Sequence, residues 1–244
     1  MGRLVTTVLV LCLIYATTRM AVFREHDLRR GLEQAMRSRL LADATPAGGS
    51  VVPMLWSRHL YNVANFTIGT PPQPASAIID VAGELVWTQC SACRRCFKQD
   101  LPLFVPNASS TFRPEPCGTA ACKSTPASNC SGNVCTYEST TNIRLDRHTT
   151  LGIVGTDTFA IGMATASLGF GCVVASDIDD TMDGTSGFIG LGRTPRSLVA
   201  QMKLTRFSYC LSPRNTGKSS RLFLGSSAKL AGGESTATAP CACS

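Results

Sequence analysis

The sequence predicts an all-β fold. Its body consists of short segments with alternating or continuous apolar residues, separated by Gly, Pro, Ser and Asn, a pattern typical of strands joined by turns. Hydrophobic residues make up 44% of the 244 residues, which is enough for the core of about one domain. The expected strands cover residues 61–68, 75–79, 84–88, 152–161, 167–174, 188–191, 207–211 and 221–224.

One helix is expected among these strands, at residues 197–202. The formal net charge of +7 is spread along the chain, without a dense run of Lys and Arg interleaved with aromatic residues. Because proteins that bind nucleic acid concentrate such residues, nucleic acid is not expected as a partner.

The N-terminal part differs from the body. Residues 4–16 form an apolar run that is too short to span a bilayer and has the length of a signal-peptide core. We therefore expect residues 1–21 to direct export, with no membrane span in the mature chain. A signal anchor, or a myristoylation box at residues 1–6, are the alternatives.

Three further segments are expected after this leader. Residues 22–55 are basic and place apolar residues at helical spacing, which fits a propeptide-like segment or, equally, an amphipathic surface helix or flexible linker. Residues 56–228 form the expected domain. Residues 229–244 are small and polar, and are expected to be disordered.

Seven of the twelve cysteines lie between Cys90 and Cys135. The spacing of Cys90, Cys93 and Cys96 could serve a metal, but no second cysteine pair or histidine cluster accompanies it. In an exported chain this density favours disulfide bonds, and the odd number after the leader leaves one thiol unpaired or joined to another chain. No metal or other cofactor is expected. The disulfide candidates are Cys90, Cys93, Cys96, Cys117, Cys122, Cys130, Cys135, Cys172 and Cys210.

Three Asn-x-Ser/Thr sequons are candidates for glycosylation, at Asn65, Asn107 and Asn129. Asn107 stands in an expected loop beside a proline, which makes it the most accessible of the three.

The most informative motif is a carboxylate at the end of an apolar strand. Residues 77–90 read A-I-I-D-V-A-G-E-L-V-W-T-Q-C, so Asp80 is followed by Val81, Ala82 and Gly83. An Asp close to a Gly is often only a turn residue. Other segments set this one apart: Y-N-V-A-N-F-T-I-G-T-P-P-Q at 61–73, C-T-Y at 135–137, G-T-D-T-F at 155–159, F-G-C at 170–172, S-G-F-I-G-L-G-R at 186–193 and F-S-Y-C-L at 207–211.

In this order the segments resemble the pepsin-like aspartic protease family. The plant nepenthesin-like branch is the most similar, and the N-terminal module of plant xylanase inhibitors shares the fold. The resemblance covers residues 61 to about 224 and implies the N-terminal lobe of the bilobal pepsin-like fold, with a disulfide-rich insert. It also implies a secreted protein of the apoplast or vacuole that acts on a protein or peptide substrate.

The resemblance makes Asp80 the candidate catalytic residue. Aspartic proteases activate a water between two carboxylates that share one proton. Proteolytic members read D-T-G-S or D-T-G-T, where the Thr hydroxyl joins the two active-site loops and the Gly lets backbone N–H groups approach the carboxylate. Val81 has no hydroxyl and Ala82 adds a Cβ where Gly is more permissive, so we expect impaired catalysis.

Two other catalytic elements of the family are altered. The substrate flap normally reads Y-G-D-G-S-x-T-x-G-x-L, and counting back from the D-T-F strand places Arg144 at the Tyr, Asp146 at the Asp and Gly152 at the later Gly. Tyr137 would serve as the flap residue only in a longer hairpin. No D-T-G or D-S-G occurs in the 244 residues, so a missing second lobe or a homodimer would have to supply the second carboxylate.

Three functions remain open. The chain is an aspartic endopeptidase by family, and two copies could unite their Asp80 carboxylates. Alternatively it is a non-catalytic inhibitor or binding protein directed at a secreted hydrolase such as a xylanase. The third reading is a truncated gene product without an independent role. The altered motif favours the second and third over an active protease.

Overall fold

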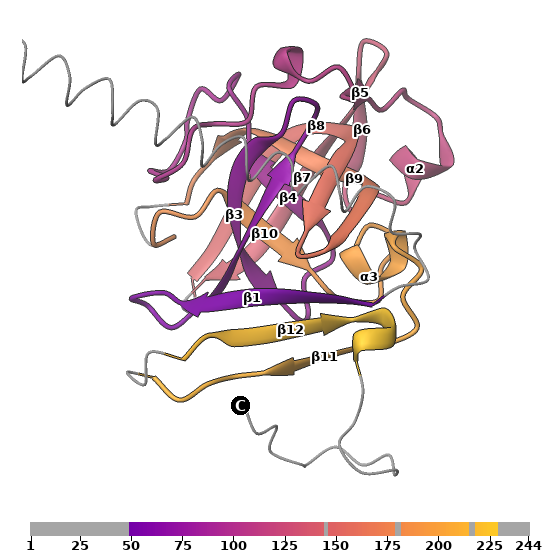
Figure 1. The fold of residues 1–244 in the computed structure, drawn as a ribbon. Coiled ribbons are helices and arrows are strands. Elements are labelled where there is room, and N and C mark those ends of the chain that lie inside the picture. The colour runs from indigo at the N-terminus through magenta and orange to yellow at the C-terminus, as the bar shows by residue number, and fades with distance from the viewer. Residues whose placement is uncertain (1–48, 144–145, 179–181, 215–217, 229–244) are drawn as a thin grey trace, which may run out of the picture. The chain divides into compact units, whose positions relative to one another are not determined.

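The structure is a computed structural model that describes residues 49–143, 146–178, 182–214 and 218–228 (Figure 1). All of them belong to one compact unit, Ala44–Ser244. The expected leader, most of the propeptide-like segment and the expected tail lie outside the described residues and stay predictions. In the described part of the chain, no helix is long and apolar enough to cross a membrane.

A sheet of twelve strands dominates the described residues and confirms the all-β prediction. The elements are β1 (Ser50–Trp56), β2 (Asn62–Ile68), β3 (Gln73–Asp80), β4 (Val86–Gln89), η1 (Pro106–Ala108), β5 (Arg113–Pro114), α2 (Ala120–Lys123), β6 (Ser128–Ser131), β7 (Val134–Ile143), β8 (Asp146–Ile161), β9 (Ala164–Ser176), β10 (Gly187–Gly190), α3 (Leu198–Gln201), β11 (Phe207–Cys210), β12 (Ser220–Leu224) and η2 (Gly225–Ser227). Across the sheet the order is β11-β12-β1-β2-β3-β10-β4-β9-β8-β7-β6, and β5 pairs with β8 beside this path.

Strand β2 closes the sheet on itself. One edge of β2 pairs with β3, and its other edge pairs first with β1, at residues 62–64, and then with β8, where Phe66 lies opposite Ile161. In Figure 1, β1, β12 and β11 cross beneath β3 and β10. The main core fills the interior, where the ring of Phe159 lies 5.8 Å from Phe66 and 5.2 Å from Phe170.

A second apolar cluster lies under the β7–β8 hairpin. Its centre is Trp87 of β4, whose ring lies 5.1 Å from that of Phe188 in β10 and 6.2 Å from that of Phe97. Buried Tyr137 from β7 and Val154 from β8 also belong to it. This cluster holds the hairpin against the strands that lead to Asp80.

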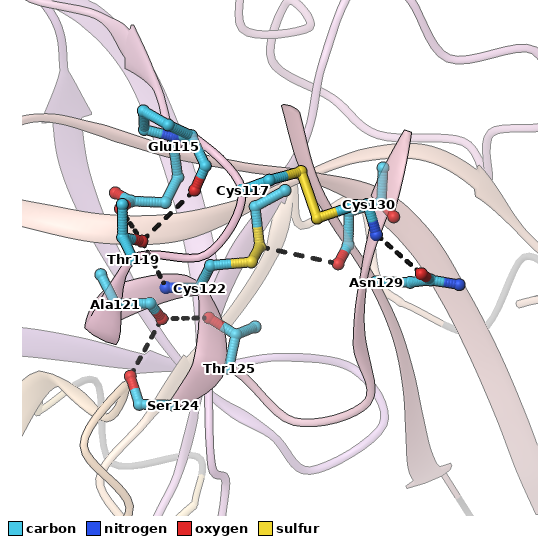
Figure 2. Close-up of a disulfide and its surroundings, with 12 residues drawn as sticks. Glu115, Cys117, Thr119, Ala121, Cys122, Ser124, Thr125, Asn129 and Cys130 are labelled. Atoms are coloured by element: carbon cyan, nitrogen blue, oxygen red, sulfur yellow. Dashed lines mark hydrogen bonds between the residues drawn. A yellow bond between two sulfur atoms is a disulfide. The ribbon is translucent and has the colours of Figure 1, made fainter. Parts of the chain in front are cut away.

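Four disulfide bonds confirm the prediction of a disulfide framework. Cys90–Cys172 joins the end of β4 to β9, and Cys93–Cys96 closes a short loop. Cys117–Cys130 joins the segment before α2 to β6 (Figure 2), and Cys122–Cys135 joins α2 to β7. Cys210 is disulfide-bonded as well.

Figure 2 also shows how the small helix α2 begins. The hydroxyl of Thr119 accepts a hydrogen bond of 3.0 Å from the N–H of Cys122 and donates one of 2.5 Å to Glu115. Such a cap satisfies an N–H group that the first turn leaves unpaired. The cap and the two disulfides therefore fix a segment that has almost no apolar core of its own.

The structure contains strands that the sequence pattern did not reveal. The strand β1 begins before residue 56, where we expected the domain to start, and its Pro53 lies where β1 pairs with β12 but not with β2. Strand β7 includes the polar stretch 138–142, E-S-T-T-N, which lacks apolar alternation and becomes a strand because β8 pairs with it throughout. The expected helix at 197–202 is present as α3.

Candidate functional site

Asp80 is the last residue of β3, and its backbone is held by the neighbouring strand β10 and by the turn that follows. It lies opposite Gly190 of the parallel strand β10, and its carbonyl accepts hydrogen bonds from the N–H of Leu191 at 2.8 Å and of Gly83 at 3.2 Å. The apolar run before Asp80 is buried between the two core clusters, and the chain turns directly after it. The strand end therefore presents this carboxylate at the surface of the sheet.

The two carboxylate oxygens of Asp80 have different surroundings. Oδ1 accepts a hydrogen bond of 3.0 Å from the N–H of Ala82. Oδ2 accepts none from any described residue. A Cβ added to Gly83 would lie 2.9 Å from Oδ2 and 2.9 Å from the Cα of Gly190. The carboxylate therefore rests in the space that any larger residue at position 83 would need.

Ala82 does not have the effect that we expected from its Cβ. It is absent from the residues with positive φ, so it adopts a conformation that Ala tolerates, and its N–H still reaches Asp80. The hydroxyl groups that the D-T-G-S and D-T-G-T motifs carry at the second and fourth positions are missing here. Val81 is 51% exposed and has no oxygen to offer, and Gly83 has no side chain. What is lost around Asp80 is hydroxyl donors, while the backbone support remains.

A pocket of about 330 Å³ opens in front of Asp80. The turn after β3 forms one side of it, the β7 strand of the hairpin the other, and Trp87 and Phe188 its floor. Asp80 and Glu84 are its charged residues. The lining consists of Asp80, Ala82, Gly83, Glu84, Leu85, Trp87, Ser139, Thr140, Thr141, Asn142 and Phe188.

Of the predicted flap residues that the structure describes, neither Asp146 nor Gly152 lines this pocket. Asp146 is the exposed first residue of β8 and pairs with Ile143, whereas Gly152 is buried and pairs with Tyr137. Arg144 lies outside the described residues. A Cβ on Gly152 would meet the carbonyl oxygen of Cys172 at 2.3 Å, so Gly152 serves close packing between β8 and β9.

Tyr137, the alternative flap residue, is also kept away from the pocket. Its side chain is 2% exposed and packs over Gly152 and Gly171 in the second core cluster. Burial raises the pKa of its phenol well above the usual range, since the charged form would lose its hydration. Tyr137 therefore belongs to the core.

Sequence reasoning missed the polar residues of β7 that face Asp80. Ser139, Thr140, Thr141 and Asn142 all line the pocket, together with Glu84. They match no motif, and their only mark in the sequence is a polar run between buried Tyr137 and Ile143, which does not reveal what the run faces.

The remaining candidates lie elsewhere on the surface. The sequon residues Asn65 in β2, Asn107 in η1 and Asn129 in β6 are all exposed. Within the described ranges, no three His, Cys, Asp or Glu residues come close enough to hold a metal ion.

Comparison with known proteins identifies the architecture. A family model described as "Xylanase inhibitor N-terminal" matches residues 62–226. The chain belongs to this family. It thereby shares the nepenthesin-like N-terminal domain of the pepsin-like aspartic proteases, and the match includes Asp80, the pocket in front of it and the β7–β8 hairpin.

Among curated relatives of this xylanase inhibitor N-terminal domain, the aspartic proteinase nepenthesin-1 of Nepenthes gracilis is 36% identical over 201 residues, covering 82% of this chain and 45% of that protein. Aspartyl protease 37 of Oryza sativa subsp. japonica is 36% identical over 220 residues, covering 85% of the chain and 47% of that protein. The chain thus spans about half the length of these relatives.

Two solved plant structures have a similar fold. Conglutin gamma from lupine seeds superposes with a TM-score of 0.56 at 21% identity, covering 73% of this chain and 50% of that one. Basic 7S globulin from soybean gives 0.55 at 23% identity, with 74% and 50% covered. At these identities the likeness concerns the fold alone.

Proposed function

We propose that this domain is a secreted nepenthesin-like lobe that binds polypeptide in the cleft at Asp80 but is severely impaired in peptide hydrolysis. One observation carries the proposal. Oδ2 of Asp80 accepts no hydrogen bond from the described residues and rests against Gly83, where proteolytic members carry a hydroxyl residue.

The chemistry of aspartic proteases explains why this matters. A carboxylate that shares a proton and orients a water must be held in a defined position, and hydrogen bonds to its oxygens provide that position. With Val81 and Gly83, the carboxylate of Asp80 has one hydrogen-bond donor among the described residues, the N–H of Ala82. A misplacement of about 1 Å can lower a rate by about a hundredfold, so the first half of the dyad is already weakened.

The cleft itself is retained. Its hydroxyl and amide residues on β7 face the Asp80 turn across an open pocket, and the two disulfides at α2 and the Trp87 cluster support both sides. A cleft that keeps its walls and loses its acid–base geometry suits binding without turnover. The description of the matching family favours a secreted hydrolase such as a xylanase as the bound protein.

Catalysis is tested by incubating the purified chain with a denatured protein at acid pH, with and without pepstatin. We expect no pepstatin-sensitive cleavage. Cleavage that pepstatin and Asp80→Asn both abolish would contradict the proposal. A variant that carries Val81→Thr and Ala82→Gly together tests whether two copies can pair their Asp80 carboxylates, because restored cleavage would require a dimer.

Binding is tested separately with a microbial xylanase, by calorimetry and by the xylanase rate. Thr141→Trp, which fills the pocket from the partly exposed face of β7, should abolish complex formation, whereas Glu138→Gln on the same strand lines no part of the pocket and should leave it intact. A complex that survives Thr141→Trp unchanged would place binding outside the cleft.

A further inference from the structure

A second pocket, of about 430 Å³, shares no lining residue with the Asp80 pocket. It lies between the segment after β10, the helix α3 and the start of β11. Its lining includes Leu191, Arg193, Val199, Ala200, Arg206 and Phe207. Its size is in the range of sites that take small molecules.

The floor of this pocket is apolar and firmly held. Leu191 is 2% exposed and belongs to the main core, and Val199 and Phe207 are partly buried against the same core. Ser197 caps α3 by accepting a hydrogen bond of 3.2 Å from the N–H of Ala200, and β11 pairs with β12 from Phe207 onward. The floor is therefore preformed.

The rim carries charge of one sign. Arg193 and Arg206 are the charged residues of the lining, both are exposed, and no acidic residue lines the pocket. Within the described part of the chain, neither guanidinium forms a hydrogen bond or an ion pair. Guanidinium groups present paired N–H donors that match the two oxygens of a carboxylate.

We propose that this pocket binds a small aliphatic carboxylate, of the class of medium-chain fatty acids. The alkyl chain lies on Leu191, Val199 and Phe207, and Arg193 and Arg206 hold the carboxylate. An inorganic anion would leave the apolar floor without a partner, and a neutral lipid would leave both charges unpaired. An amphipathic anion satisfies both parts of the pocket.

The pocket also touches the backbone that supports Asp80. The N–H of Leu191 donates to the carbonyl of Asp80, and the N–H of Gly192 donates to the carbonyl of Gly83 at 2.9 Å. A bound carboxylate would therefore lie behind the Asp80 turn. The binding reaction itself is independent of the proposed cleft, so each can fail without the other.

Calorimetry on the purified chain with octanoate tests the inference. Acetate, which lacks the long alkyl chain, and octanol, which lacks the carboxylate, are the control ligands. We expect octanoate to bind at least about tenfold more tightly than either. The double variant Arg193→Gln/Arg206→Gln should weaken octanoate by about tenfold or more. Arg58→Gln/Arg221→Gln, which removes the same charge from two exposed sites away from this pocket, should leave it unchanged.

Ala200→Trp fills the pocket while keeping both arginines, and it should also abolish octanoate binding. Equal binding of octanoate and octanol, or equal loss in both double variants, would overturn the proposal. An apolar peptide with a free C-terminus is the rival ligand. If it binds more tightly than octanoate, and if amidation of its C-terminus abolishes that binding, the pocket takes a peptide terminus and the fatty-acid proposal is overturned.

Discussion

The N–H of Ala82 donates a hydrogen bond of 3.0 Å to Oδ1 of Asp80, in the position where proteolytic relatives carry Gly. This contact shows that the backbone and the side chains of the altered motif must be considered separately. The backbone donor survives the change to Ala82, and the hydroxyls at positions 81 and 83 do not. The proposed impairment therefore rests on missing hydroxyl groups more than on the backbone conformation.

This distinction leads to a prediction for a proteolytic relative that carries D-T-G-S. Replacing Ser by Gly at the last position should lower kcat by about a hundredfold, whereas replacing Gly by Ala at the third should cost less, because the N–H is kept. Steady-state kinetics on the two single variants measures the difference. Equal losses would mean that the Cβ of residue 82 matters as much as the hydroxyl.

Gly83→Ala should destabilise this domain. The new Cβ would approach Oδ2 of Asp80 and the Cα of Gly190 at 2.9 Å each, and the Gly190 backbone cannot move away from β3 freely. A cost of about 1 to 3 kcal/mol is expected in urea unfolding. Ala82→Gly next to it is the control, with a loss below about 1 kcal/mol.

Gly152→Ala distinguishes a structural role from a flap role. Its Cβ would meet the carbonyl oxygen of Cys172 at 2.3 Å, and that backbone is held within β9. We expect the free energy of unfolding to fall by about 2 kcal/mol or more. If the variant has the parent's free energy of unfolding but no longer binds in the cleft, that result would support the flap role that the sequence assigned to Gly152.

Arg196 is 6% exposed, and its Nε and Nη2 atoms have no hydrogen-bond partner in the described structure. Burial lowers the pKa of this guanidinium, and the nearby Glu115 opposes that shift in part. Arg196→Met should therefore stabilise the domain by about 1 to 3 kcal/mol, since it removes a buried charge whose hydrogen bonds are only partly satisfied. Arg193→Met, at an exposed position, should change stability by less than about 0.5 kcal/mol.

The pH dependence of this effect has a defined sign. A lowered pKa means that the folded state holds the proton of Arg196 less tightly than the unfolded state, so stability would rise with pH. The rise falls in the strongly alkaline range where arginine titrates. Substitution, measured at neutral pH, is therefore the practical test.

The disulfides should differ in their contribution according to the chain that each one closes. Cys90–Cys172 spans 82 residues and Cys93–Cys96 spans 3. A chain-entropy account gives about 4.5 kcal/mol for the first and about 2 kcal/mol for the second. Paired Cys→Ala variants measure both by urea unfolding, and a larger loss from the short loop would contradict the account.

Strands with apolar alternation could be predicted from the sequence, and β2, β3, β9 and β12 lie close to where they were expected. The polar half of β7 could not, because its strand conformation comes from pairing with β8 and not from its own residues. Asp80 was predictable because a motif marks it. The pocket wall at 139–142 was not, since only the hairpin brings it opposite Asp80.

The first and last strands of the described sheet are neighbours: β1 pairs with β12, with Ser50 opposite Leu224. The described chain therefore enters and leaves this sheet at adjacent points. Chains with adjacent ends tolerate circular permutation and insertion into a host protein. A short linker from residue 228 to residue 49, with new ends opened in an exposed loop, should give a rearranged chain with the same sheet.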